Sequence, residues 1–183
     1  MIKKIINFLN EDELKIVSQY FKFANKFFDK EYSNPAINRV KGGSFTSNPD
    51  FVAESILLAK KEIVEEAVGE KVLPTYSYSR LYINGSELIK HVDRPSCEVS
   101  ITLNIFGDKD WKIYMRPKNS SVEPLGLTTQ PGEGVLYEGM KYQHWREKYT
   151  GEKCMQIFLH YVRANGEYKQ YYKDKRADFG TKK

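Results

Sequence analysis

The sequence is poor in features that mark several classes of protein. No apolar run approaches the roughly 20 residues that a membrane-spanning helix requires, and lysines interrupt the N-terminal segment too early for a secretory signal. Only two cysteines are present, Cys97 and Cys154, which argues against a disulfide framework and favours reduced thiols. We find no internal repeat and no low-complexity segment. We therefore expect a cytoplasmic protein with no membrane partner.

The chain does contain enough apolar and aromatic material for one packed domain. It has 183 residues, of which 40% are hydrophobic, including 13 tyrosines and 10 phenylalanines. That length is sufficient to bury a sizeable core. We expect a single domain made of a helical region over 1–72, a strand-rich region over 73–163 and a basic tail over 164–183. The net charge is +5, and we interpret the tail as a solvated, partly ordered segment.

Two helices are predicted in the first third of the chain. Asn10 followed by Glu13 is a capping-box pattern, which predicts that a helix begins there. The apolar residues that follow at helical spacing are Leu14, Val17, Phe21, Ala24 and Phe28. A second helix is predicted from Asn48-Pro49-Asp50, with proline at the first helical position, to Gly69. Its expected buried side consists of Phe51, Ile56, Ile63 and Val64.

After residue 74 the pattern changes to short strands separated by turns. The predicted strands are 75–83, 88–92, 98–106, 111–115, 135–137, 144–146 and 153–162, with a loop over 119–130. The last two strands are interpreted as a pair joined around Thr150-Gly151. Many short strands with turn residues between them are typical of an antiparallel sandwich or barrel. We expect the helices to pack against one outer face of it.

Three residues have the spacing of a metal site. His91 and Asp93 are two apart on a predicted strand, so their side chains share one face, and His144 lies 53 positions later. Two histidines and one carboxylate suit Fe(II) with open coordination positions, although a catalytic zinc site uses the same ligand types. The third histidine, His160, is an alternative distal ligand, which we interpret as structural.

The motifs around these residues occur in a recognisable order. Tyr82-Ile83-Asn84-Gly85-Ser86-Glu87-Leu88 leads into His91-Val92-Asp93, and Pro131-Gly132-Glu133-Gly134 precedes His144-Trp145-Arg146-Glu147. A basic residue, Lys153, follows nine positions after His144. Over about residues 75–162 the chain resembles the 2-oxoglutarate- and Fe(II)-dependent oxygenases, in particular the small prolyl-hydroxylase-like proteins of phage and bacteria. The resemblance implies a mainly β fold with N-terminal helices, the cupin-like double-stranded β-helix or jelly roll.

The resemblance also implies a chemistry. His91, Asp93 and His144 would hold Fe(II), and 2-oxoglutarate and O₂ would be consumed to give succinate, CO₂ and a hydroxylated C–H bond, with ascorbate as an optional reductant. Retention of Asp93 favours hydroxylation over halogenation. The residues expected to bind the co-substrate are Lys153, Tyr82 and Thr102, with Lys153 pairing with its distal carboxylate. Possible contacts to substrate or co-substrate are Arg94, Glu98 and Arg146.

The family members that it most resembles suggest a prolyl residue in a peptide or protein as the substrate, while small molecules and nucleic acids stay open alternatives. No separate acid or base is expected, because the chemistry takes place at the metal. One competing hypothesis is a non-catalytic jelly-roll module with a vestigial metal site that binds nucleic acid or protein. Another is a zinc hydrolase, which would need a nearby general base and would have no use for Lys153.

Overall fold

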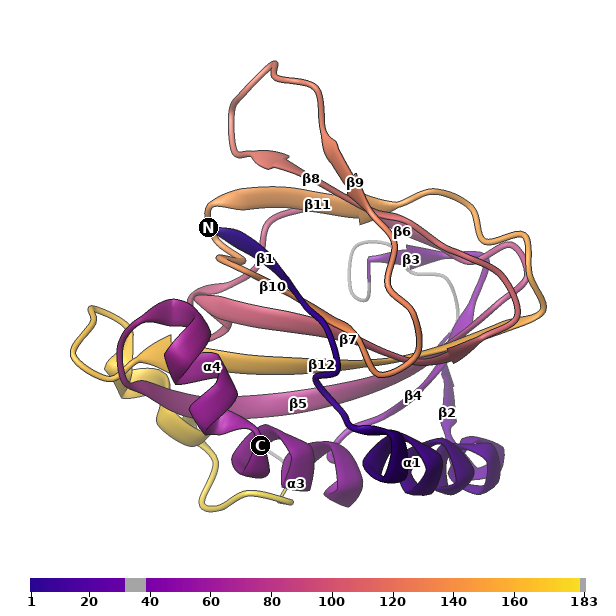
Figure 1. Cartoon of the computed structure of the whole chain (residues 1–183), viewed down its shortest axis with the longest axis horizontal. Helices are drawn as coiled ribbons and strands as arrows, with labels where there is room; N and C mark the ends of the chain where they lie inside the picture. The colour runs from indigo at the N-terminus through magenta and orange to yellow at the C-terminus, as the bar shows by residue number, and fades with distance from the viewer. Residues whose placement is uncertain (32–38, 182–183) are drawn as a thin grey trace.

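Two antiparallel β-sheets face each other, and helices cover the outer side of the larger sheet (Figure 1). The computed structural model describes residues 1–31 and 39–181. In spatial order, the larger sheet contains β1 (Ile2–Ile5), β10 (Gly134–Tyr137), β7 (Val99–Gly107), β12 (Lys153–Arg163), β5 (Val72–Ile83), β4 (Ser44–Ser47) and β2 (Asp29–Glu31). The smaller sheet contains β3 (Val40–Lys41), β6 (Glu87–His91), β11 (Tyr142–Arg146), β8 (Ile113–Pro117) and β9 (Leu125–Leu127). The predicted mainly β class with N-terminal helices is confirmed.

The first helix, α1 (Glu11–Ala24), begins as its sequence predicts. The Asn10 side chain accepts a hydrogen bond from the Glu13 backbone N–H at 2.9 Å, and the Glu13 carboxylate accepts one from the Asn10 N–H at the same distance. Such a cap contributes about 1 kcal/mol to helix stability. Val17 and Phe21 are buried on the side of α1 that packs against the larger sheet.

The second predicted helix is divided in two. Asp50 is the N-cap and accepts from the Ala53 N–H, so α3 (Phe51–Ala59) begins after Pro49 rather than at it. A break at Lys60 separates α3 from α4 (Lys61–Val68), which ends at Gly69 with a left-handed φ of 84°. Phe51, which was expected to be buried, is 71% exposed, because it occupies the first position of α3 on the side away from the sheet.

The two faces of β12 separate the core from the space between the sheets. Met155, Ile157, Leu159 and Tyr161 face the helices and are fully buried in the main core. Each such side chain contributes on the order of 2 kcal/mol through removal of its apolar surface from water. The alternate residues of β12, Cys154, Gln156, Phe158 and His160, therefore face the smaller sheet. The part of the interior that β12 lines therefore carries polar and aromatic groups and no aliphatic side chain.

Several strands lie where the sequence pattern predicts none. β1, β2, β3 and β4 fall in the part of the chain that was predicted as helical, and β9 falls in the predicted 119–130 loop. Each has only two to four residues, which is too short to show an alternating pattern. The strands β11 and β12 were interpreted as a pair, but they belong to opposite sheets, and the segment between them crosses from one sheet to the other.

Part of the basic tail is tied to the body of the protein, contrary to the expectation of a solvated segment. The 3₁₀ segment η3 (Lys169–Lys175) packs against β5, and Asp174 in it is 5% exposed. Arg176 pairs with Glu54 of α3 at 3.2 Å, with both side chains 4% exposed. A search of the described helices finds none with the length and apolar character needed to cross a membrane.

Candidate metal centre and cavity

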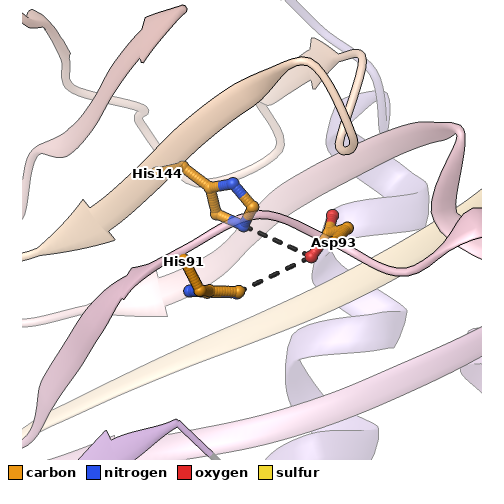
Figure 2. Close-up of side chains that lie close together, drawn as sticks. All are labelled: His91, Asp93 and His144. Carbon is orange, nitrogen blue, oxygen red and sulfur yellow. Dashed lines mark ion pairs between the residues drawn. The ribbon is translucent and has the colours of Figure 1, made fainter. Parts of the chain in front are cut away.

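The three predicted metal ligands converge on one point at an end of the smaller sheet (Figure 2). His91 of β6 and His144 of β11 are directly paired across the two strands, and their ring centroids are 4.2 Å apart. Asp93 follows β6, and its Oδ1 lies 3.6 Å from His91 Nε2 and 3.4 Å from His144 Nε2. Ligand atoms of all three residues lie within 4.8 Å of one another. One divalent cation could therefore contact all three.

Backbone carbonyls fix the orientation of both imidazole rings. His91 Nδ1 lies 2.7 Å from the Ile89 carbonyl oxygen, and His144 Nδ1 lies 3.1 Å from the Tyr142 carbonyl oxygen. A carbonyl only accepts, so each Nδ1 carries the proton and each Nε2 presents a lone pair toward Asp93. This second set of contacts is the arrangement that orients histidine ligands in metal sites.

Glycine is required next to the carboxylate ligand. The Asp93 N–H donates to the Gly139 carbonyl oxygen at 2.9 Å, and Asp93 Oδ2 accepts from Ser100 Oγ at 3.1 Å. A Cβ atom at position 139 would overlap the Asp93 carboxylate and lie 2.5 Å from the Cys97 carbonyl oxygen. Only glycine lets the two backbone segments approach this closely.

Electrostatics favour the metal-binding protonation states of His91 and Asp93. Burial, together with the adjacent His144, lowers the pKa of His91 to about 4. Burial raises the pKa of Asp93, but the neighbouring histidines, with His144 foremost, outweigh it and hold that pKa well below its usual range. At pH 7 His91 is neutral and Asp93 is charged, a donor set that fits a divalent first-row metal.

The ligands line a cavity of about 460 Å³ between the sheets. On the larger sheet its wall includes alternate residues of β5, which are Tyr76, Tyr78, Arg80 and Tyr82. Tyr82, a predicted co-substrate residue, is fully buried and packs edge-on against Trp111 at a centroid distance of 4.8 Å. Tyr137 of β10 closes the cavity near the metal ligands, with its Oη 3.5 Å from His144 Nε2.

Arg146 places a buried cation two residues beyond His144 on β11. Its side chain is 1% exposed and its guanidinium lies over the Trp111 ring, 4.9 Å from the centroid. Nη1 donates to the Trp111 carbonyl oxygen at 2.6 Å, and Nη2 lies 3.3 Å from both Thr102 Oγ1 and Gln156 Oε1. Its Nε–H has no acceptor, and none of the carboxylates whose side chains the structure describes, in 1–29 and 39–181, forms an ion pair with it. A buried cation in this state is costly and fits an anionic ligand.

Lys153 does not share this environment, which corrects the expectation that it pairs with the co-substrate. It is the first residue of β12 and its side chain is exposed, while its backbone N–H donates to Asp108 Oδ1 at 3.0 Å. Side chains alternate along a strand, so Lys153 has the orientation of Met155 and Ile157, away from the cavity. The inward position next to it is Cys154, which is buried.

The remaining candidate contacts divide between the cavity and the surface. Thr102 is fully buried on β7, and its Oγ1 donates to Gln156 Oε1 at 3.2 Å and accepts from Arg146. Arg94 lines the cavity. Glu98 does not line it, because its carboxylate pairs with Arg163 at 2.7 Å. The expectation that Glu98 contacts substrate is thereby corrected.

His160 lies beside the site rather than away from it. Its Nδ1 is 2.9 Å from Ser100 Oγ, and its ring lies 4.5 Å from that of Tyr76. Asp93, Cys97 and His160 form a second group whose ligand atoms lie within 4.8 Å of one another. Burial lowers the pKa of His160 to about 4. The structure therefore brings both distal histidines to Asp93, but only His144 faces His91.

Arg80, Tyr76 and Tyr78 lie on the cavity wall and were not predicted from the sequence as site residues. The available signal was the alternation of tyrosines at 76, 78 and 82 in a strand whose other face is buried against helices. Residues that alternate with the tyrosines are small or aliphatic, so the larger polar groups had to face the interior between the sheets.

The comparisons with known proteins bear on the fold. No protein-family model and no curated protein sequence matches the chain. Among solved structures, a 2OG-Fe(II) oxygenase family oxidoreductase from Burkholderia pseudomallei has a TM-score of 0.70 at 12% identity, over 90% of this chain and 86% of that one. A prolyl-4-hydroxylase from Pseudomonas putida has a TM-score of 0.64 at 14% identity, over 88% and 92%. HygX from Streptomyces hygroscopicus, solved with nickel and 2-oxoglutarate bound, has a TM-score of 0.64 at 11% identity, over 90% and 83%. The chain therefore has the jelly-roll fold of the 2-oxoglutarate–Fe(II) oxygenases, prolyl hydroxylases among them.

Proposed function

We propose that the protein is an Fe(II)- and 2-oxoglutarate-dependent dioxygenase that hydroxylates an unactivated C–H bond and releases succinate and CO₂. The observation that carries this proposal is the pairing of two unusual features on one strand. A 2-His-1-carboxylate set converges at His144, and a buried arginine without a carboxylate partner in the described residues lies at Arg146. A molecule that chelates a metal at one end and carries an anionic group at the other would satisfy both.

The spacing between the two features suits 2-oxoglutarate. Two residues along a strand correspond to about 7 Å, which is comparable to the length of an extended five-carbon dicarboxylic acid. His91 Nε2, His144 Nε2 and the Asp93 carboxylate would hold the metal. Arg146 would pair with the distal carboxylate of the co-substrate, and Thr102 and Tyr82 would flank it. Arg146 therefore takes the role of binding the distal carboxylate, which the sequence analysis had given to Lys153.

A ferrous centre in this site supplies the coupling of 2-oxoglutarate decarboxylation to C–H oxidation by O₂. The protein's own residues bind and orient the reactants. Asp93 is fixed by Ser100 and by the close approach of Gly139, so the ligand geometry is set before the reactants bind. Tyr82, Tyr137 and Trp111 are buried around the co-substrate position and limit the access of water.

The substrate assignment rests on analogy of fold. The Pseudomonas putida neighbour is a prolyl-4-hydroxylase, and a prolyl residue in a peptide or protein is the corresponding hypothesis here. Ascorbate would serve as an optional reductant that keeps the iron ferrous.

Anaerobic titration with Fe(II) and then 2-oxoglutarate, followed by measurement of succinate in air, tests the proposal. We expect one equivalent of each to bind, and we expect H91A and D93A to abolish binding of the metal. A zinc hydrolase would retain zinc and ignore 2-oxoglutarate, and a non-catalytic module would bind neither. If H160A abolished iron binding while H144A did not, the distal ligand would be His160.

A further inference from the structure

A second group of metal-binding side chains adjoins the first. Asp93, Cys97 and His160 offer an oxygen, a sulfur and a nitrogen atom that all lie within 4.8 Å of one another. Ligand atoms on a tetrahedral zinc ion lie about 3.3–3.8 Å apart, so closure on an ion needs shifts of about 1 Å or less in each side chain. All three residues line the cavity, and an ion in the cavity can therefore reach them.

The fold brings these three donors together from separate segments. Asp93 follows β6, Cys97 ends the 3₁₀ turn η2 (Pro95–Cys97), and His160 lies on the inward face of β12. Cys97 is 3% exposed and His160 is 6% exposed. Both are therefore held in place by packing beside the carboxylate, unlike mobile side chains at the surface.

The two carboxylate oxygens of Asp93 serve different sides of the residue. Oδ1 is the oxygen that lies 3.6 Å from His91 Nε2 and 3.4 Å from His144 Nε2 (Figure 2). Oδ2 lies 3.1 Å from Ser100 Oγ, which is itself 2.9 Å from His160 Nδ1. The carboxylate of Asp93 can therefore serve either group of ligands.

The second donor set suits a thiophilic divalent cation. The Asp93 carboxylate and a Cys97 thiolate carry two negative charges, which would neutralise a divalent ion in this buried position. A thiol loses its proton to solvent when it coordinates a metal. Tyr76 Oη lies 3.1 Å from Cys97 Sγ and can donate to the thiolate. Thiolate and imidazole together favour zinc over harder ions.

A cationic side chain also lies in this loop, between the carboxylate and the thiol. Arg94 forms two hydrogen bonds with the Asp174 carboxylate, at 2.8 and 2.9 Å. Because its positive charge is matched by this ion pair, Arg94 opposes a bound cation less than an unpaired guanidinium would.

From this geometry we propose that Asp93, Cys97 and His160 form a second metal site, which takes Zn(II) or a similar thiophilic divalent ion. Asp93 is also a ligand of the proposed iron site. Two divalent ions would exceed the negative charge that Asp93 and Cys97 supply, so the two sites are occupied one at a time. An ion in the second site keeps Asp93 from the first. This second site does not depend on the dioxygenase activity proposed above.

Anaerobic titration of the H91A variant with Co(II), a spectroscopic substitute for Zn(II), tests the proposal. H91A removes a ligand of the first site and keeps all three of the second. We expect one equivalent of Co(II) to bind with a thiolate-to-cobalt charge-transfer band in the near ultraviolet, and we expect Zn(II) to remove the band. Adding C97S or H160Q to H91A should weaken Co(II) binding at least about 10-fold, and C97S should abolish the band. The matched control is C154S, because Cys154 is the other buried cysteine and belongs to neither group.

The outcomes that would overturn the second site are direct. If Co(II) gives no thiolate band in H91A, or if C97S keeps the band, Cys97 is not a ligand and the proposal is wrong. An unchanged band and affinity in H160Q would exclude His160 and refute it equally. Far-UV circular dichroism checks that each variant is folded, and H144A and C97A replace H91A and C97S where it is not. Failure of the proposed function is distinct: wild type with Fe(II) would bind no 2-oxoglutarate, while the cobalt band of H91A would remain.

Discussion

Replacing Arg146 by methionine should weaken co-substrate binding roughly 100-fold without unfolding the protein. The guanidinium is fully buried and has a free Nε–H that can donate to an incoming carboxylate. Methionine keeps the apolar volume over the Trp111 ring and removes the charge. The predicted change is therefore confined to recognition of the distal carboxylate of 2-oxoglutarate.

The expected magnitude follows from the contacts that are lost. A hydrogen bond to a charged group contributes about 1.5–3 kcal/mol, so two such bonds to a carboxylate give about 3 kcal/mol or more, a factor of roughly 100 in Kd. In the ligand-free protein, the same substitution should increase the free energy of unfolding. Loss of an uncompensated buried cation relieves a desolvation cost on the order of several kcal/mol, which exceeds about 1–3 kcal/mol for leaving the Trp111 carbonyl oxygen without its donor.

Thermal unfolding under anaerobic conditions measures both effects. With Fe(II) present, 2-oxoglutarate at about 100 times its Kd should stabilise the wild type by about 2.7 kcal/mol. At the same concentration it should stabilise R146M by only about 0.4 kcal/mol, because the variant's Kd is about 100-fold higher. The ligand-free Tm of R146M should equal or exceed that of the wild type. K153A is the matched control and should respond to 2-oxoglutarate as the wild type does, because the Lys153 side chain is exposed. If K153A lost the response while R146M kept it, our assignment of the co-substrate site would be refuted.

Three further predictions concern the supports of the site. G139A should weaken Fe(II) binding at least about 10-fold in an equilibrium titration, because the new Cβ would displace the Asp93 carboxylate. R176Q should lower the free energy of unfolding by about 3 kcal/mol and the Tm by about 6–12 °C, because it leaves Glu54 buried without its partner. In the metal-free protein, His91 should account for a loss of about 2 kcal/mol of stability between pH 7 and pH 5 in urea denaturation, and His160, whose pKa is likewise lowered to about 4, should account for a similar loss. The pKa of His91 is lowered to about 4 in the folded state, so the unfolded state takes up the proton first as the pH falls.

Each of these has its own control. G139A should keep the far-UV circular dichroism of the wild type, so that a loss of metal is not confused with misfolding. K173Q should leave the Tm unchanged, since Lys173 pairs with an aspartate that is 70% exposed on its side chain. The metal-free H91A variant should show a shallower dependence on pH than the wild type. An unchanged dependence in H91A would mean that His91 is not the responsible group.

The residues that could hold a metal could be picked out from the sequence because their geometry is local. His91 and Asp93 are two apart, and the resemblance supplied the distal His144, which the structure places directly opposite His91. The capping box at Asn10 could be predicted equally well, because both of its hydrogen bonds lie within four residues. Such features depend on spacing along one segment, and spacing is what a sequence displays.

Features that depend on the relation between segments could not be predicted. Lys153 has the expected spacing from His144, but its side chain points away from the cavity. Which residues of β12 point inward is set by the register in which the strand pairs with its neighbours, and a sequence does not show that register. The burial of Arg176 against Glu54 joins positions 122 residues apart. The short strands β3 and β4 form against the edges of β6 and β5, and β2 then pairs with β4, although their own residues show no pattern.

One irregularity of the smaller sheet has a consequence for how metal affinity could be tuned. His144 pairs with His91 and Arg146 with Leu88, so β6 uses one residue more than β11 across the same interval. Ile89 lies within this interval, and its carbonyl oxygen is the acceptor that holds the His91 ring. Removing one residue there would give a regular ladder in which His91 still faces inward but rotates without restraint. The bulge thus restricts the orientation of the His91 ring. The deletion would make the sheet more regular and would lower its affinity for the metal.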